Sequence, residues 1–286
     1  MYDRILLPID DSESVTEIHR HAAALAQETG ATVQVLFVAD TTRKSTTADV
    51  VGALEREGEG IVDDVASTFA SRGVDYGTDV VRGSPAETIV EYAERNDYEL
   101  IVLPTHARSG LSRYLLGSVT EKVVRLSSVP VLTARLRATD RLTFPYERVL
   151  VPTDGSDAAL HAARHALELA ASLDAAVHVL SVVDDRSLGP DIRSVLSTAE
   201  LEQPARDAIA DVAGVAESYD VPAVHTHVEH GAPADTIASA IDDLDTDVVV
   251  MGTTGRQGVG RILLGSVAEQ TVRTAPVPVI TVTHDE

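Results

Sequence analysis

Two single glycines and a Gly-Ser pair near the end of the chain are the residues best suited to chemistry. Residues 248–251 (VVVM) are short and wholly apolar, as expected of a strand buried on both faces. Gly252 and Gly255 follow, and after nine intervening residues Gly265 and Ser266 open a segment whose apolar periodicity predicts a helix. Glycine allows a positive φ and a close approach to a ligand, and the N–H groups at a helix start attract anions. The pattern favours a phosphate-binding loop; alternatively, the glycines only permit a tight strand-to-helix connection.

Two other phosphate-binding motifs do not fit this loop. A P-loop needs Gly-Lys-Ser or Gly-Lys-Thr before its helix, which is absent here. The dinucleotide fingerprint follows the first strand of its unit, whereas these glycines come late. The spacing Gly-x2-Gly-x9-Gly-Ser, after a strand ending in Met-Gly, instead resembles the universal stress protein (UspA) family, where it marks the members that bind ATP. The resemblance extends over almost the whole chain, twice.

The resemblance implies a set of nucleotide contacts in the second half of the chain. Asp154 and its neighbours would contact the adenosine part of ATP, with Val182 against the base. Arg256 and Arg261 lie inside the loop and could pair with phosphate oxygens, or be solvated surface side chains. Asp154 has an alternative role as the cap of the following helix. The implied binding residues are Pro152, Thr153, Asp154, Val182, Met251, Gly252, Thr253, Gly255, Arg256, Gly265, Ser266 and Val267.

The chain contains one unit written twice. Residues 2–10 (YDRILLPID) return as 146–154 (YERVLVPTD), and 115–119 (LLGSV) return as 263–267. Gly-Ser-Pro at 83–85 and Val-Pro-Val at 129–131 also have partners, at 231–233 and 277–279. The offset between the copies is 144 at the start and 148 later. Four matched anchors in the same order indicate an internal duplication.

Strands and helices alternate within each copy. In the first copy we expect strands at 4–9, 32–38, 74–82, 100–103 and 130–133. We expect a first helix from Asp11 or Ser12 to about Glu28 and a long second helix that ends at about Arg72. A third helix should begin at Ser84 and a fourth near Gly117. The second copy repeats this order, but Pro190 and Pro204 interrupt its middle helical segment, 187–218.

This alternation predicts an α/β fold of two tandem Rossmann-like, doubly wound domains, with parallel strands and helices on both faces. The resemblance implies five strands per domain in the order 3-2-1-4-5. Ligands of such sheets bind at the carboxyl ends of strands 1 and 4, where the winding reverses, so Asp154 should lie near Gly252. We expect domains at 1–138 and 146–286, with Pro145 in the linker. The family's final strands pair across a dimer interface, which implies a pseudo-dimer within this chain and allows a further homo-oligomer.

The first copy departs from the glycine pattern. Pro104 and Ala107 stand where the second copy has Gly252 and Gly255, while Gly117 and Ser118 are kept. If both positions need a positive φ, alanine costs ~1–2 kcal/mol and proline cannot adopt it. A total of about 2–4 kcal/mol would weaken binding about 30- to 1,000-fold, so we expect one competent site per chain, in the second copy. Alternatively, the first loop binds in another conformation through Gly117, Ser118 and Arg113.

Composition limits the environment and the partners. The formal charge of −22 argues against nucleic acid or an anionic membrane as partner. Only two lysines are present, Lys44 and Lys122, and an acidic, lysine-poor surface suits a halophilic protein, because concentrated salt screens carboxylate repulsion. There is no cysteine, no signal-peptide pattern and no apolar run long enough to cross a membrane. We therefore expect a cytoplasmic protein.

No catalytic or metal-binding residue is predicted. His161 and His165 have helical spacing, and His225 and His227 share a strand face with Glu229, but neither set matches a metal signature, so we expect surface histidines. No general base is evident beside the loop, so fast ATP hydrolysis is not expected. The leading hypothesis is a nucleotide-responsive stress module that binds ATP, with Mg²⁺ held by phosphates and water. The alternatives are a slow ATPase or nucleotidyl-transfer enzyme, and a nucleotide-free dimerisation scaffold.

Overall fold

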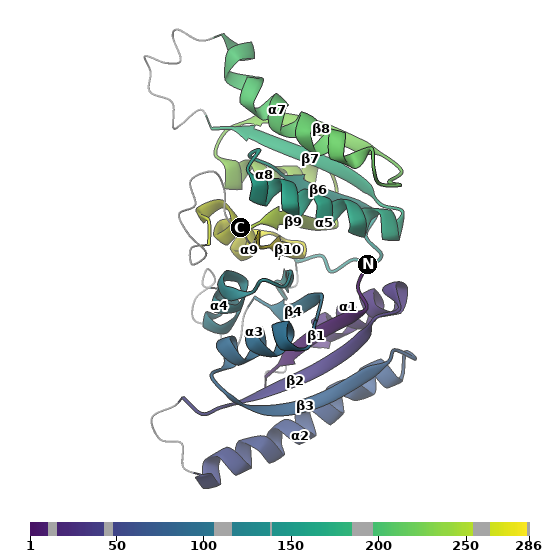
Figure 1. Ribbon diagram of the computed structural model, residues 1–286, viewed down its shortest axis with the longest axis vertical. Helices are drawn as coiled ribbons and strands as arrows, with labels where there is room; N and C mark the ends of the chain where they lie inside the picture. The colour runs from purple at the N-terminus through teal and green to yellow at the C-terminus, as the bar shows by residue number, and fades with distance from the viewer. Residues whose placement is uncertain are drawn as a thin grey trace. The chain divides into compact units, whose positions relative to one another are not determined.

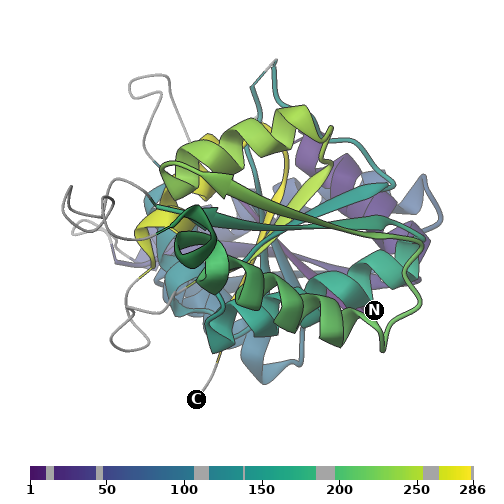
Figure 2. The ribbon, with the colours of Figure 1, turned by 90° about the horizontal axis from the view of Figure 1, so that it is seen from above.

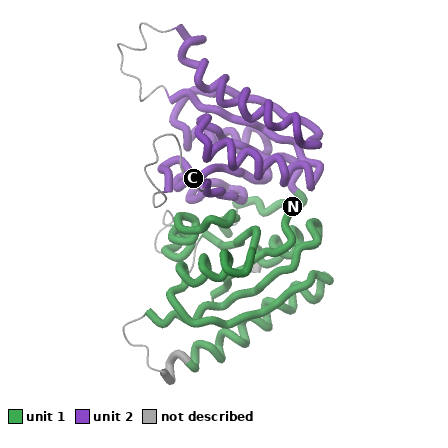
Figure 3. The backbone as a smooth tube through the Cα atoms, in the orientation of Figure 1, with its two compact units in different colours: residues 1–145 green, residues 146–286 purple. Residues whose placement is uncertain are grey.

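A computed structural model describes residues 1–10, 16–42, 48–105, 116–137, 139–184, 197–253 and 264–284 of the 286-residue chain. The chain divides into two compact units, Met1–Pro145 (unit 1) and Tyr146–Glu286 (unit 2), which Figure 3 colours separately. Each unit alternates strands with helices, as the duplicated sequence pattern predicts.

Unit 1 contains five strands and four helices in its described ranges. Its strands at the centre of the sheet are continuous apolar runs, because both of their faces are buried. Gly30 ends the first helix with a φ of 75°. The elements are β1 (Arg4–Ile9), α1 (Thr16–Thr29), β2 (Thr32–Asp40), α2 (Ala48–Ala70), β3 (Tyr76–Gly83), α3 (Pro85–Arg95), β4 (Leu100–Pro104), α4 (Ser118–Leu126) and β5 (Val131–Ala134).

Unit 2 repeats this order in the residues that the structure describes. The elements are β6 (Arg148–Pro152), α5 (Asp157–Leu173), β7 (Ala176–Val183), α7 (Thr198–Ala216), β8 (Val224–His230), α8 (Pro233–Asp243), β9 (Val248–Gly252), α9 (Ser266–Thr274) and β10 (Val279–Val282). Pro204 lies inside α7 rather than ending it. A capping box formed by Ser197 and Glu200 satisfies the start of that helix and favours its formation despite the proline. Pro190 lies outside the described residues.

The five strands of each unit run parallel. Their order is β3-β2-β1-β4-β5 in unit 1 and β8-β7-β6-β9-β10 in unit 2. In unit 2, α5 and α7 cover one face of the sheet and α8 and α9 cover the other, as Figures 1 and 2 show. The predicted fold class and strand order are therefore confirmed. β6 and β9 are neighbours, so the winding reverses between them.

Small side chains bring helix α5 close to its sheet. Its buried face is rich in alanine, and Ala162, Ala163 and Ala166 are fully buried. The strands beneath supply branched aliphatic side chains such as Val149 and Val248, also fully buried. This pairing of small and branched residues explains how a chain with 3% aromatic residues fills its core.

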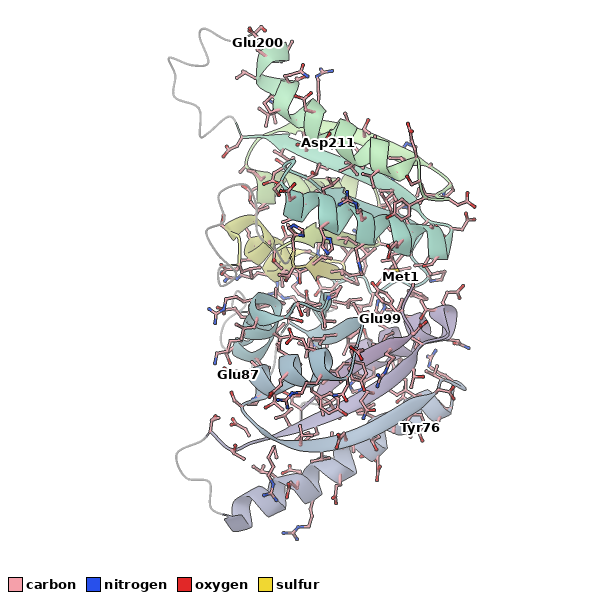
Figure 4. All side chains as sticks on the ribbon, in the orientation of Figure 1. Met1, Tyr76, Glu87, Glu99, Glu200 and Asp211 are labelled. Carbon is pink, nitrogen blue, oxygen red and sulfur yellow. The ribbon has the colours of Figure 1, made fainter. Side chains whose placement is uncertain are left out.

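Carboxylates occupy the outer faces of the helices. Glu87 on α3 and Glu200 and Asp211 on α7 are exposed and are labelled in Figure 4. No helix in the described ranges combines the length and apolar character that a membrane span requires.

Candidate functional site

The candidate site lies at the carboxyl ends of β6 and β9, which are side by side. Val149 and Leu150 of β6 pair with Val248 and Val249 of β9. Two segments about 100 residues apart in sequence, around Pro152 and around Gly252, therefore end at the same edge of the sheet. This is the position where open α/β sheets bind ligands.

β7 brings Val182 to the same edge. Pro152 pairs with Leu180, and the N–H of Thr153 donates to the carbonyl of Leu180 at 2.8 Å. Val182 is two residues further along β7 and half-buried. It can therefore offer an apolar surface beside the end of β6, as a nucleobase requires.

Asp154 organises the turn that leads into α5. Its Oδ1 accepts hydrogen bonds from the N–H of Ser156 at 3.0 Å and from the Oγ–H of Ser156 at 2.6 Å. Ser156 is the N-cap, because its Oγ accepts from the N–H of Ala159 at 3.2 Å. The alternative that Asp154 itself caps the helix is therefore wrong. Asp154 is exposed and orients the capping serine.

Gly252 does not have the positive φ that would itself require glycine. It is the last residue of β9, where it pairs with Val282, and its φ is not positive. Its missing side chain matters for packing instead. A Cβ on Gly252 would lie 3.0 Å from the carbonyl oxygen of Ala158 and 3.1 Å from its carbonyl carbon. Glycine thus lets the first turn of α5 pack against the end of β9.

Thr253 and Gly265 close the base of the loop. The N–H of Gly265 donates to the carbonyl of Thr253 at 2.7 Å, and the N–H of Thr253 donates to Val282 at 3.1 Å. Thr253 is 4% exposed, so this closure is anchored in the core. The two ends of the loop are thereby held together whatever lies between them.

Helix α9 starts at the loop with its N-terminus open. Gly265 is its N-cap, with a φ of −62°, and no side chain in the described part of the chain caps it. Ser266 is exposed and Val267 is half-buried. The first N–H groups and the positive end of the helix dipole therefore face the loop side, which suits an anion.

Of the remaining predicted residues, the structure describes Met251. Met251 is 5% exposed and pairs with Thr281 inside the sheet. Gly255, Arg256 and Arg261 lie outside the described residues, so their predicted contacts stay predictions.

The same frame exists in unit 1 with different side chains. The N–H of Gly117 donates to the carbonyl of Thr105 at 2.8 Å, as Gly265 does to Thr253. Pro104 ends β4 in the strand, where Gly252 ends β9, so proline is compatible with this backbone. The predicted conflict over φ is therefore wrong at this position. The hydroxyl of Thr120 donates to the carbonyl of Pro104 at 2.8 Å. Ala107 and Arg113 lie outside the described residues.

A buried histidine that no sequence motif indicates lies near the equivalent edge of unit 1. His19 on α1 is 6% exposed and its Nε2 is buried without a hydrogen-bond partner among the described residues. Burial lowers the pKa of His19 to about 4, while the nearby Asp10, the counterpart of Asp154, acts in the opposite direction. The second copy has Ala163 at the matching position. The two copies thus differ on the helix as well as on the loop.

Comparisons with known proteins agree with this architecture. The family model of the universal stress protein family matches residues 1–135 and 145–283. A universal stress protein of Methanocaldococcus jannaschii is 39% identical over 140 residues, covering 48% of this chain and 82% of that protein. One of Mycobacterium tuberculosis is 34% identical over 219 residues, covering 74% of this chain and 70% of that protein.

A solved structure shows the same fold over the full length. The universal stress protein from Archaeoglobus fulgidus DSM 4304 matches with a TM-score of 0.78 at 24% identity, covering 99% of this chain and 98% of that chain. The sequence matches and the duplicated five-stranded units together place the protein: the chain belongs to the universal stress protein family and carries two tandem copies of its domain.

Proposed function

We propose that unit 2 binds ATP at the carboxyl ends of β6 and β9 and that this occupancy regulates the protein. The observation that carries the proposal is the open N-terminus of α9. The hydrogen bond from Gly265 to Thr253 holds it at the end of β9, and Gly252 packs that strand end on the first turn of α5, the helix that follows Asp154. An anion-binding helix end, an acceptor carboxylate and an apolar strand end then lie along one edge. These match the phosphate, ribose and base of a nucleotide in turn.

Each described residue has a proposed task. The N–H groups at Ser266 and Val267 bind phosphate oxygens, aided by the helix dipole. Asp154 accepts hydrogen bonds from ribose hydroxyls, and its bond to Ser156 holds the carboxylate in place. Val182 packs against the base. Mg²⁺ accompanies the nucleotide, bound mainly by phosphates and water, and neutralises part of the phosphate charge.

We propose regulation rather than rapid catalysis. Among the described residues at this edge, Asp154 is the only carboxylate assigned to the nucleotide, and its Oδ1 accepts two hydrogen bonds from Ser156. This carboxylate is thus engaged with the capping serine and assigned to the ribose, and neither task activates an attacking water. Slow turnover would leave ATP bound long enough to serve as a signal.

We also propose, from packing, that the two units differ in their ability to bind ATP. At the end of β4 the ring of Pro104 occupies the position where Gly252 has no side chain. The glycine that permits close packing on α5 in unit 2 is therefore replaced by proline in unit 1. We infer one ATP site per chain, in unit 2.

The test is a thermal shift of the full chain with MgATP in concentrated KCl, combined with mass spectrometry of any co-purifying small molecule. The wild type should melt at a higher temperature with MgATP, and Gly255→Pro should abolish the shift. Gly214→Ala, on the exposed side of α7, is the control and should keep it. Phosphate release above a blank would favour a slow ATPase instead. No nucleotide effect at high salt would favour a scaffold and end the proposal.

Three expectations from the sequence stay predictions: a cytoplasmic location, the absence of nucleic-acid partners, and pairing of the two copies as a pseudo-dimer, with or without further oligomers.

A further inference from the structure

Three histidines gather on one face of β7 and β8, at the edge of the unit 2 sheet. The parallel register sets His178 opposite His225, and His227 is the next residue of β8 on the same face. The Nδ1 of His178 and the Nε2 of His227 are 3.1 Å apart, one ring nitrogen donating to the other. The ring of His225 lies 4.9 Å from that of His178, between centroids. The strand register therefore brings together a histidine cluster that no sequence motif indicates.

Unit 1 fills the same place with residues that are already engaged. Gln34, Gly77 and Asp79 occupy the positions of His178, His225 and His227. The side chain of Gln34 covers Gly77, and the hydroxyl of Tyr92 on α3 donates to Asp79 at 3.0 Å. Both copies thus satisfy this patch of sheet, but only unit 2 does so with imidazoles.

The partner on the covering helix has changed as well. The position of Tyr92 on α3 corresponds to Ala240 on α8. Alanine has no polar group to offer His227, so the ring pairs with His178. His225 is exposed, and His178 and His227 are half-buried, so a small solute can reach all three. β8 is an edge strand, open on one side within its own sheet.

The spacing of the two ring nitrogens suits one metal ion. Zinc–imidazole bonds are about 2.0–2.1 Å long. Two such bonds whose nitrogens are 3.1 Å apart meet at an angle of about 100°, between octahedral and tetrahedral values. A cation can take this position if each ring turns by about 40°, so that both lone pairs face it. The ring that donates the hydrogen bond must also change tautomer, with its proton moving to the other ring nitrogen. No group of three or more His, Asp or Glu in the described ranges is arranged to hold a metal, so water would fill the remaining positions.

A negative charge also lies beside the pair. Glu229 follows His227 by two residues on β8, so the two side chains lie on the same face of the strand. Its carboxylate favours a cation at this place.

We propose that His178 and His227 form a two-histidine site for a late first-row divalent cation, such as Zn²⁺, Ni²⁺ or Cu²⁺, on the exposed edge of unit 2. Imidazole nitrogen is a preferred ligand for these metals and a poor one for Mg²⁺. The bound cation bridges β7 and β8 and stabilises the edge strand by mass action. The site is separate from the nucleotide edge and does not depend on it.

The experiment is calorimetry of the full chain, without an affinity tag or nucleotide, titrated with ZnCl₂ and with NiCl₂ at pH 7.5. We expect one cation per chain and a raised melting temperature. His227→Gln and His178→Gln should each lower the affinity at least about tenfold, or ~1.4 kcal/mol. His161→Gln, a histidine of the same unit on α5, is the matched control and should leave the affinity unchanged. MgCl₂ should give no comparable heat.

Three results would overturn the proposal: no Zn²⁺ or Ni²⁺ binding, binding that survives both substitutions, or binding lost in His161→Gln alone. A measurement on the unaltered chain guards against variants that fold poorly. With one equivalent of Cu²⁺, electron paramagnetic resonance should show two coordinated imidazole nitrogens. A spectrum with one or none contradicts the site.

Discussion

Gly252 at the end of β9 lies directly against the backbone of Ala158 in the first turn of α5, where a Cβ would be 3.0 Å from the Ala158 carbonyl oxygen. Because the neighbour is backbone, it can yield only if α5 moves. We expect Gly252→Ala to lower the free energy of unfolding by about 1–3 kcal/mol. The same shift should weaken ATP binding at least about tenfold, or ~1.4 kcal/mol. Chemical denaturation and calorimetry measure the two effects.

Gly214 provides the matched control for Gly252. It lies in α7, is exposed, and has open space where a Cβ would be. Gly214→Ala should raise stability by about 0.5–1 kcal/mol, because alanine favours a helix. If Gly252→Ala proves as harmless as Gly214→Ala, the packing role assigned to Gly252 is wrong.

The turn between β6 and α5 separates capping from nucleotide binding. Ser156→Ala removes the N-cap of α5 and should cost ~1 kcal/mol of stability. Asp154→Ala should reduce ATP affinity more strongly than Ser156→Ala does, because it also removes the proposed ribose acceptor. Ser197→Ala, the equivalent cap loss on α7, should lower stability and leave ATP affinity unchanged. Equal affinities for Asp154→Ala and Ser197→Ala would exclude Asp154 from the site.

Acid should destabilise unit 1 through His19. Burial lowers the pKa of His19 to about 4, whereas the unfolded chain titrates it near 6.5. Between these values the unfolded state binds the extra proton, so stability falls as the pH falls from about 6.5 to about 4. His19→Ala, which copies Ala163 of unit 2, should flatten this dependence by at most ~1.4 kcal/mol per pH unit. If the free energy of unfolding depends on pH equally steeply in the wild type and in His19→Ala, the role assigned to His19 is wrong.

Salt should stabilise the protein through its 45 acidic residues against 23 basic ones. The Debye length falls from about 10 Å at 0.1 M to about 3 Å at 1 M salt, which screens the repulsion between carboxylates. We therefore expect the melting temperature to rise as KCl is raised to molar levels. Sucrose at equal osmolarity, which is excluded from the surface but does not screen charge, should stabilise less. A melting temperature that falls with KCl would reject a halophilic character.

The fold could be predicted because the sequence patterns that indicate its strands and helices are local and occur in both copies. Short apolar runs predict the central strands, and Ser84, from which a helix is expected, is the N-cap of α3. The middle helix of the second copy does not follow from the sequence, because Pro204 is typical of a helix break. In the structure, the capping box at Ser197 and tertiary packing outweigh the proline.

The position of the site could be predicted from the sequence, but the structural roles of its residues could not. The glycine spacing located the loop, yet the role of Gly252 depends on Ala158, which is distant in sequence and adjacent only after folding. The N-cap was open to prediction, since serine is among the preferred capping residues and Ser156 directly precedes α5. The pairing of His178 with His227 required the register of two strands, which one sequence does not provide.

The most direct test of the central claim is calorimetry of the full chain with MgATP in concentrated KCl. One ATP site in unit 2 predicts a stoichiometry near one per chain, lost in Gly255→Pro. A stoichiometry near two, or one site that persists in Gly255→Pro, would contradict it.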